Sequence, residues 1–222
     1  MKKLFAISFS ICFLASFSTL AFAQQNAPFY NDIQNFKKQD SINPPPQHAI
    51  LFVGSSSFTK WTDVQNYFPD FKIINRGFGG SSLPDVIHFA NEVIITYHPK
   101  QVVIYCGDND FAASDTVSVQ TVNDRFKKLF WIIRKNLPDA NIVYVSIKPS
   151  PSRIKLMEKG DEANIAIKKF LSTQKNTVFI DVFHLMLKNG IPMPSIFLSD
   201  SLHMNANGYA IWKKAIEPVL KK

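Results

Sequence analysis

The segment His48-Ala-Ile-Leu-Phe-Val-Gly-Ser-Ser-Ser57 joins an unbroken apolar run, Ala49 to Val53, directly to a glycine and a serine cluster. Short apolar runs without alternation are typical of strands that are buried on both faces of a sheet. Four further runs of this kind follow along the chain: Lys72 to Asn75, Gln101 to Cys106, Asn141 to Ser146 and Thr177 to Val182. The sequence therefore predicts five buried strands.

Amphipathic stretches separate these runs and predict helices. The expected helices cover Leu83 to Tyr97, Val119 to Lys135, Arg153 to Ser172 and Asn205 to Leu220. Ser82 and Asp85 are start signals for the first helix, whereas Gly160 weakens the third. Alternating strands and helices predict an α/β fold in which right-handed crossovers cover both faces of a parallel sheet. A chain of 222 residues is long enough for one such domain.

The N-terminal residues have the composition of an export signal. Lys2 and Lys3 precede an apolar stretch from Leu4 to about Leu20, and Ala21-Phe22-Ala23 places small residues at a cleavage site. We predict a signal peptide over residues 1–23, export to the periplasm or the medium, and no stable membrane insertion once the peptide is removed. An uncleaved anchor is the alternative, although the stretch barely reaches the ~20 residues that spanning requires. The residues before Cys12 disfavour a lipoprotein.

Residues 24–47 are predicted to be a lead-in segment before a main domain at residues 48–222. Its Pro44-Pro45-Pro46 run does not fit a central strand or a helix interior. Part of the segment could still form a short helix that packs against the domain through its apolar residues, which are Phe29, Tyr30, Ile33 and Phe36. The formal charge of +8 is dispersed or paired along the chain, which argues against a nucleic-acid partner. Export leaves Cys106 as the single cysteine, so no internal disulfide is expected.

The residue types needed for nucleophilic catalysis occur where a parallel sheet would bring them together. Asp200 and His203 stand three residues apart, and serines 55–57 follow the first strand. A serine, a histidine and an orienting carboxylate turn a hydroxyl into an attacking group. Ligands of open parallel sheets bind outside the carboxyl ends of the strands, where the segments 75–82 and 107–110 also fall. The sequence therefore predicts a serine hydrolase, with these two segments as sources of oxyanion donors.

The order of these segments and the residues in them resemble the SGNH or GDSL family of esterases and lipases over almost all of residues 48–220. The resemblance implies a flavodoxin-like three-layer α/β/α sandwich around a five-stranded parallel sheet. It also implies a catalytic triad of Ser56, Asp200 and His203, and an oxyanion hole formed by the Ser56 backbone with Gly80 and Asn109. The chain departs from the family at Ser55, where an aspartate is usual.

Each of these residues also has a structural interpretation. Ser56 could cap a helix, and His203 could be a surface or capping histidine. Gly80 could serve a tight turn alone, and Asn109 could tie its loop together. The presence of all the segments in the same order favours the catalytic roles.

Charged residues near the predicted site are expected to support it rather than react. Asp108 and Asp110 are interpreted as loop and supporting groups, because bare carboxylates would oppose the charge of an oxyanion. Lys148 follows the fourth strand and is either a substrate contact or a solvated lysine. No histidine or cysteine spacing indicates a metal site, and the predicted chemistry needs no cofactor.

The blocks VGSSS, NRGFGGS, CGDND and SIKPSP look closest to family members of the platelet-activating-factor acetylhydrolase type. This likeness implies hydrolysis of esters with a short acyl group such as acetyl, through an acyl-enzyme. The alcohol part could belong to a small molecule, a glycan or a lipid, and the oligomeric state is open. Lipase-like or lysophospholipase activity on longer acyl chains is one alternative. The other is a ligand-binding module that kept the fold but lost efficient catalysis, for which Ser55 is the supporting sign.

Overall fold

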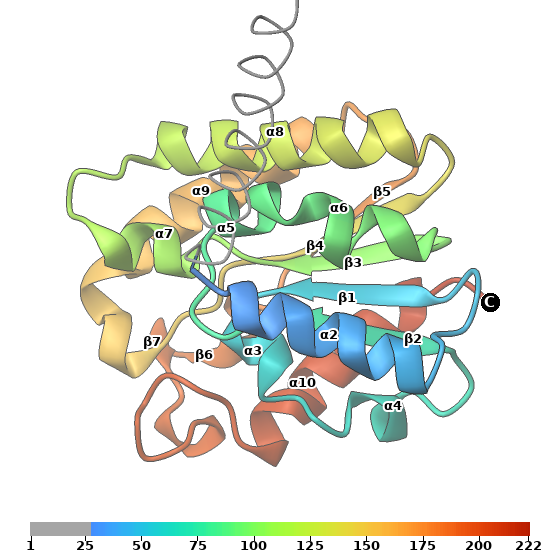
Figure 1. The fold of residues 1–222 in the computed structure, drawn as a ribbon. Coiled ribbons are helices and arrows are strands. Elements are labelled where there is room, and N and C mark those ends of the chain that lie inside the picture. The colour runs from blue at the N-terminus through green and yellow to red at the C-terminus, as the bar shows by residue number, and fades with distance from the viewer. Residues whose placement is uncertain (1–27) are drawn as a thin grey trace, which may run out of the picture.

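The computed structural model describes residues 28–222, and the predicted signal peptide at residues 1–23 lies outside them. Five parallel strands form the central sheet in the order β2-β1-β3-β4-β5 (Figure 1). They are β1 (Ile50–Gly54), β2 (Ile73–Gly77), β3 (Gln101–Tyr105), β4 (Asn141–Val145) and β5 (Thr177–Ile180). Every residue of β1, β3 and β4 is buried, as their apolar runs predict, but the edge strands β2 and β5 are only partly buried, so the prediction of fully buried strands holds for the three central strands. The predicted α/β fold with a five-stranded parallel sheet is confirmed.

Helices cover both faces of the sheet (Figure 1). One face is covered by α2 (Tyr30–Ile42), α5 (Leu83–His88), α6 (Ala90–Val93), α8 (Val119–Asn136) and α9 (Met157–Leu171). The other face is covered by α3 (Ser56–Thr59), α4 (Val64–Tyr67) and α10 (Ala206–Ile216). Each layer encloses its own hydrophobic cluster against the sheet. Within residues 28–222, no helix combines the length and apolar character that a membrane span requires.

The first predicted helix begins as expected but is interrupted. Ser82 and Asp85 form a capping box at the start of α5. The helix then ends at Phe89, and α6 ends at Ile94, because the backbones of both residues leave helical geometry. The Phe89 ring packs against the Phe78 ring, with 6.3 Å between the centroids. Tertiary packing thus overrides the local helical pattern.

The third predicted helix also begins later than the pattern indicates. Pro151–Leu156 form a 3₁₀ turn, η2, and α9 starts only at Met157. Gly160 is accommodated within α9 as a buried residue. This 3₁₀ turn matters for the site, because it carries Arg153.

Helix α2 shows that part of the lead-in segment packs against the sheet. The Ile33 side chain is buried in the core on that face. Arg76, at the edge strand β2, pairs with Asp40 of α2, and its Nε donates to the Tyr97 hydroxyl at 2.6 Å. The guanidinium also lies 5.1 Å from the centroid of the Phe36 ring. The segment therefore forms the short helix that its apolar residues allow.

The turn after β1 depends on a glycine. Gly54 has a φ of +132°, and a Cβ at this position would lie 1.9 Å from the carbonyl oxygen of Tyr105. That carbonyl accepts the N–H of Ser55 at 3.0 Å. The close approach of β1 and β3 thus requires glycine here, and it delivers Ser55 and Ser56 to the carboxyl end of the sheet.

Candidate active site

The loops at the carboxyl ends of the strands bring the predicted site residues together. Ser56 opens α3 after β1, and Gly80 follows β2. Asn109 lies in α7 (Asp108–Ala113), directly after β3. Asp200 and His203 lie in the loop before α10. This arrangement follows the rule that open parallel sheets gather their functional groups at the carboxyl ends of the strands.

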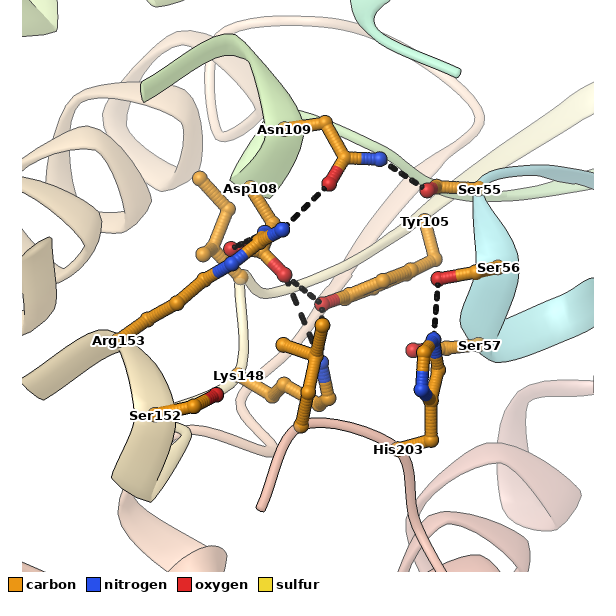
Figure 2. A network of polar contacts seen from close by, with 12 residues as sticks. Ser55, Ser56, Ser57, Tyr105, Asp108, Asn109, Lys148, Ser152, Arg153 and His203 are labelled. Carbon is orange, nitrogen blue, oxygen red and sulfur yellow. Dashed lines mark hydrogen bonds and ion pairs between the residues drawn. The ribbon is translucent and has the colours of Figure 1, made fainter. Parts of the chain in front are cut away.

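Ser56, His203 and Asp200 form a continuous chain of hydrogen bonds. The Nε2 of His203 lies 3.0 Å from the Oγ of Ser56 (Figure 2), and its Nδ1 lies 2.6 Å from the Oδ2 of Asp200. If the carboxylate accepts the proton on Nδ1, Nε2 is free to accept the serine hydroxyl. Ser55, not Ser56, occupies the N-cap position of α3. The Ser56 hydroxyl is therefore not used as a helix cap.

The loop around Asp200 is folded about its carboxylate. The Oδ1 atom accepts the backbone N–H groups of Leu202 and His203 at 3.0 and 2.9 Å. Ser201, between acid and base, has a left-handed backbone with φ 56°. The hydrogen bond from His203, with the two backbone donors, holds the pKa of Asp200 well below its usual range. The carboxylate therefore stays ionised at neutral pH and keeps the imidazole in one orientation.

Two backbone N–H groups beside Ser56 are available as donors. Within residues 28–222, the N–H groups of Ser56 and Gly80 have no hydrogen-bond acceptor. Ser56 is the first residue of α3, where N–H groups lack an intrahelical partner. Gly80 has a φ of +88°, and a Cβ on its neighbour Gly79 would lie 4.0 Å from the Cβ of Ser56. Unpaired N–H groups next to a nucleophile are suited to stabilise an oxyanion.

The side-chain amide of Asn109 is held from both ends. Its Nδ2 donates to the Oγ of Ser55 at 2.6 Å (Figure 2). The same nitrogen donates to the carbonyl of Ser81 at 2.9 Å. Its Oδ1 accepts from Arg153 at 2.9 Å. Asn109 thus ties its loop to its neighbours and also places its amino group one residue from Ser56. Donation to an oxyanion would exchange the neutral Ser55 hydroxyl for a charged acceptor, which makes the stronger hydrogen bond.

A buried charge cluster, which the sequence analysis missed, lies beside these residues. Asp108 pairs with Arg153 at 2.6 Å and with Lys148 at 3.5 Å, and the Tyr105 hydroxyl lies 3.4 Å from it (Figure 2). Burial by itself raises the pKa of Asp108, but the two cations outweigh burial and lower it. The side chain of Lys148 is only 2% exposed, so the interpretation as a solvated lysine is wrong. We define Tyr105, Asp108, Lys148 and Arg153 as the charge cluster.

The negative charge of Asp110, the second acidic residue after β3, is also balanced by a cation. Asp110 pairs with Arg125 at 2.8 Å and accepts the N–H of Leu83 at 2.9 Å. Asp108 and Asp110 are therefore not bare carboxylates, as expected, and their supporting role in the site stays a prediction. Cys106, which directly follows β3, is fully buried, and burial raises the pKa of its thiol. Within residues 28–222, no group of three histidine, cysteine, aspartate or glutamate side chains is placed to hold a metal ion.

Comparison with known proteins places this geometry in a family. The chain belongs to the GDSL-like lipase/acylhydrolase family, whose model matches residues 51–211. N-acylneuraminate cytidylyltransferase of Escherichia coli is 25% identical over 204 residues, which cover 89% of this chain but only 46% of that relative. The chain therefore spans about half the length of the curated relative that it matches.

Solved structures share the fold at low sequence identity. A structure from Streptococcus pneumoniae named for platelet activating factor has a TM-score of 0.74 and 19% identity, and the match covers 96% of this chain and 99% of the other. A catalytic mutant of the acetylxylan esterase from Geobacillus stearothermophilus has a TM-score of 0.62 and 16% identity, with 78% and 94% covered. The predicted resemblance to SGNH and GDSL hydrolases is confirmed.

Proposed function

We propose that this protein is an exported serine esterase that hydrolyses carboxylic esters of short acyl groups, acetyl above all. The observation that carries the proposal is the hydrogen-bond chain from Ser56 Oγ through His203 to Asp200, with distances of 3.0 and 2.6 Å. Membership of an acylhydrolase family supports the reaction class and a small-molecule ester as substrate. A glycan or lipid ester remains within the proposal.

The proposed reaction has two halves. His203 takes the proton of the Ser56 hydroxyl while its oxygen attacks the ester carbonyl, and the negative charge moves to the carbonyl oxygen. The N–H groups of Ser56 and Gly80 and the amide of Asn109 stabilise that oxyanion. The imidazolium returns the proton to the departing alcohol, which leaves an acyl group on Ser56. Water then attacks the acyl-enzyme by the same route and releases the acid.

Acyl size is the main test of the proposal. We expect p-nitrophenyl acetate and propionate to be cleaved with a higher kcat/KM than octanoate or longer esters, because a closed acyl pocket gains nothing from added methylenes. The acyl preference is supported by likeness to acetylhydrolases and by a structural neighbour that is an acetylxylan esterase. In a long groove, by contrast, each methylene contributes about 0.8 kcal/mol at most, so kcat/KM would climb up to roughly fourfold per carbon.

The chain-length series separates the alternatives as well. A steady climb from acetate to octanoate would reject the short-acyl proposal and favour a lipase or lysophospholipase. No hydrolysis at any length, together with no labelling by a fluorophosphonate, would favour a ligand-binding module. The wild-type protein serves for both measurements.

Export is supported by the composition of residues 1–23. We expect the protein recovered from the periplasm or the medium of an expressing bacterium to begin at Gln24, as measured by intact mass and N-terminal sequencing. Replacing Ala21 and Ala23 with bulky residues should leave the precursor uncleaved, because the peptidase site requires small side chains. Recovery of the full-length chain in the membrane fraction would contradict cleavage and favour the anchor.

A further inference from the structure

Arg153 connects the charge cluster to the proposed oxyanion hole. Its guanidinium lies 2.6 Å from Asp108 Oδ1 through one terminal nitrogen and donates to Asn109 Oδ1 at 2.9 Å through the other. The two acceptors belong to the first two residues of α7. The guanidinium fork therefore bridges them, with an ion pair to the carboxylate and a hydrogen bond to the amide oxygen. Figure 2 shows Arg153 on the far side of Asn109 from Ser55.

This contact, together with the Ser81 carbonyl that accepts from Nδ2, fixes which way the Asn109 amide faces. Arginine can only donate, so the atom of Asn109 opposite Arg153 must be the carbonyl oxygen Oδ1. A flipped amide would set its amino group against the guanidinium, with donors facing donors. The amino group of Asn109 is thereby directed to Ser55 and Ser81, beside the proposed nucleophile.

The charge cluster in turn fixes Arg153. Asp108 is buried and ionised, and its second oxygen faces Lys148 at 3.5 Å and the Tyr105 hydroxyl at 3.4 Å. Lys148 also donates to that hydroxyl at 3.2 Å. Because these partners are buried, the carboxylate that holds the guanidinium has little freedom to move.

The residue at position 55 gives this support more weight. Ser55 presents a neutral acceptor to Asn109, whereas the aspartate usual in the family would present a charged one. Hydrogen bonds to ionised acceptors are roughly twice as strong as those between neutral groups. The hydrogen bond to Ser55 is therefore weaker than one to an aspartate would be, while the Ser81 carbonyl and Arg153 hold the amide of Asn109 at its two ends.

We infer that Arg153 is a positioning residue, which orients the Asn109 amide for the oxyanion without touching the substrate. This inference rests on the proposed esterase function. Arg153→Ala is expected to lower kcat about 10- to 100-fold, the size of loss that small misplacements of catalytic groups produce, with KM changed less than about threefold. Arg153→Lys should recover only part of the rate, because one ammonium cannot span both acceptors as the fork does.

A double-mutant cycle with p-nitrophenyl acetate tests the inference. If Arg153 acts through Asn109, the variant with both residues replaced by alanine should be no slower than Asn109→Ala alone. If the fold-losses of kcat in the two single variants multiplied in the double variant, the two residues would act independently and the inference would be overturned. A KM raised at constant kcat would also overturn it, because Arg153 would then contact the substrate.

Arg125→Ala is the matched control. Arg125 forms the same kind of pair with Asp110, one residue beyond Asn109, but donates to no atom of Asn109. Its loss should lower the melting temperature, because breaking an ion pair with a buried carboxylate mainly costs stability, and it should lower kcat much less than Arg153→Ala does, because Asp110 keeps the N–H of Leu83 as a donor. If Arg125→Ala slowed turnover as much as Arg153→Ala, general loosening of the loop would explain both, and the inference would fail.

Nuclear magnetic resonance gives a readout that needs no turnover. The side-chain amide signals of Asn109, assigned by their loss in Asn109→Asp, should shift or broaden in Arg153→Ala and stay in place in Arg125→Ala. Unchanged signals in Arg153→Ala would overturn the orientation argument. If the signals change in Arg153→Ala but the wild-type protein hydrolyses no ester, the result would support the orientation and refute the proposed function.

Discussion

Replacing Ser56 with alanine is expected to abolish ester hydrolysis and fluorophosphonate labelling together, while the protein stays folded. The Oγ of Ser56 is the atom that faces His203 at 3.0 Å, and the same atom would carry the label. Loss of a triad member commonly costs on the order of 10⁴ or more in rate. Initial rates with p-nitrophenyl acetate and the mass of the labelled protein are the measurements.

Ser57→Ala is the control for this prediction. Ser57 is the next residue of the serine cluster and is buried, and its backbone carbonyl accepts the hydroxyl of Tyr209 at 2.9 Å. The substitution should leave labelling intact, because the backbone contact does not depend on the side chain. Labelling that persisted in Ser56→Ala and vanished in Ser57→Ala would shift the nucleophile by one residue and refute the assignment.

Local patterns predict the parts of this fold that depend on short stretches of sequence. The apolar runs locate all five strands to within a few residues. For the three central strands the reason is burial on both faces, which leaves little room for polar side chains. The caps at Ser82 and Asn205 are also visible in the sequence, since their partners lie two or three residues away. The interruption at Phe89 is not visible in the sequence; there the Phe89 ring packs against Phe78, in the loop before α5.

The same distinction applies to the site. Ser56, Asp200 and His203 occur in segments whose order along the chain already indicates their meeting at the sheet edge. The contact of Arg153 with Asn109 joins residues 44 positions apart and has no motif of its own. The burial of Lys148 is likewise invisible, because its sequence neighbours do not show that Asp108 lies 3.5 Å away. Pairings between distant charges follow from the tertiary fold.

Replacing Asn109 with alanine is expected to lower kcat by roughly 10² to 10³, with little change in KM. The amide lies next to Ser56 through its bond to Ser55, and the charge that it would stabilise exists only in the transition state. Steady-state kinetics with p-nitrophenyl acetate measure the effect. Because Asn109 also holds Ser81, the melting temperature should be recorded in parallel to detect a loss of loop structure.

Asn109→Asp tests whether the N–H donor of Asn109 matters apart from the size and shape of its side chain. The carboxylate has nearly the volume of the amide and can still accept from Arg153, but it has no N–H to give and brings a negative charge toward the oxyanion. It should therefore be at least as slow as Asn109→Ala even where it is the more stable protein. Asn136→Ala, an exposed asparagine of α8, should leave kcat unchanged. A folded Asn109→Ala protein with the wild-type kcat would assign Asn109 to the scaffold, and the oxyanion would then depend on the backbone donors of Ser56 and Gly80.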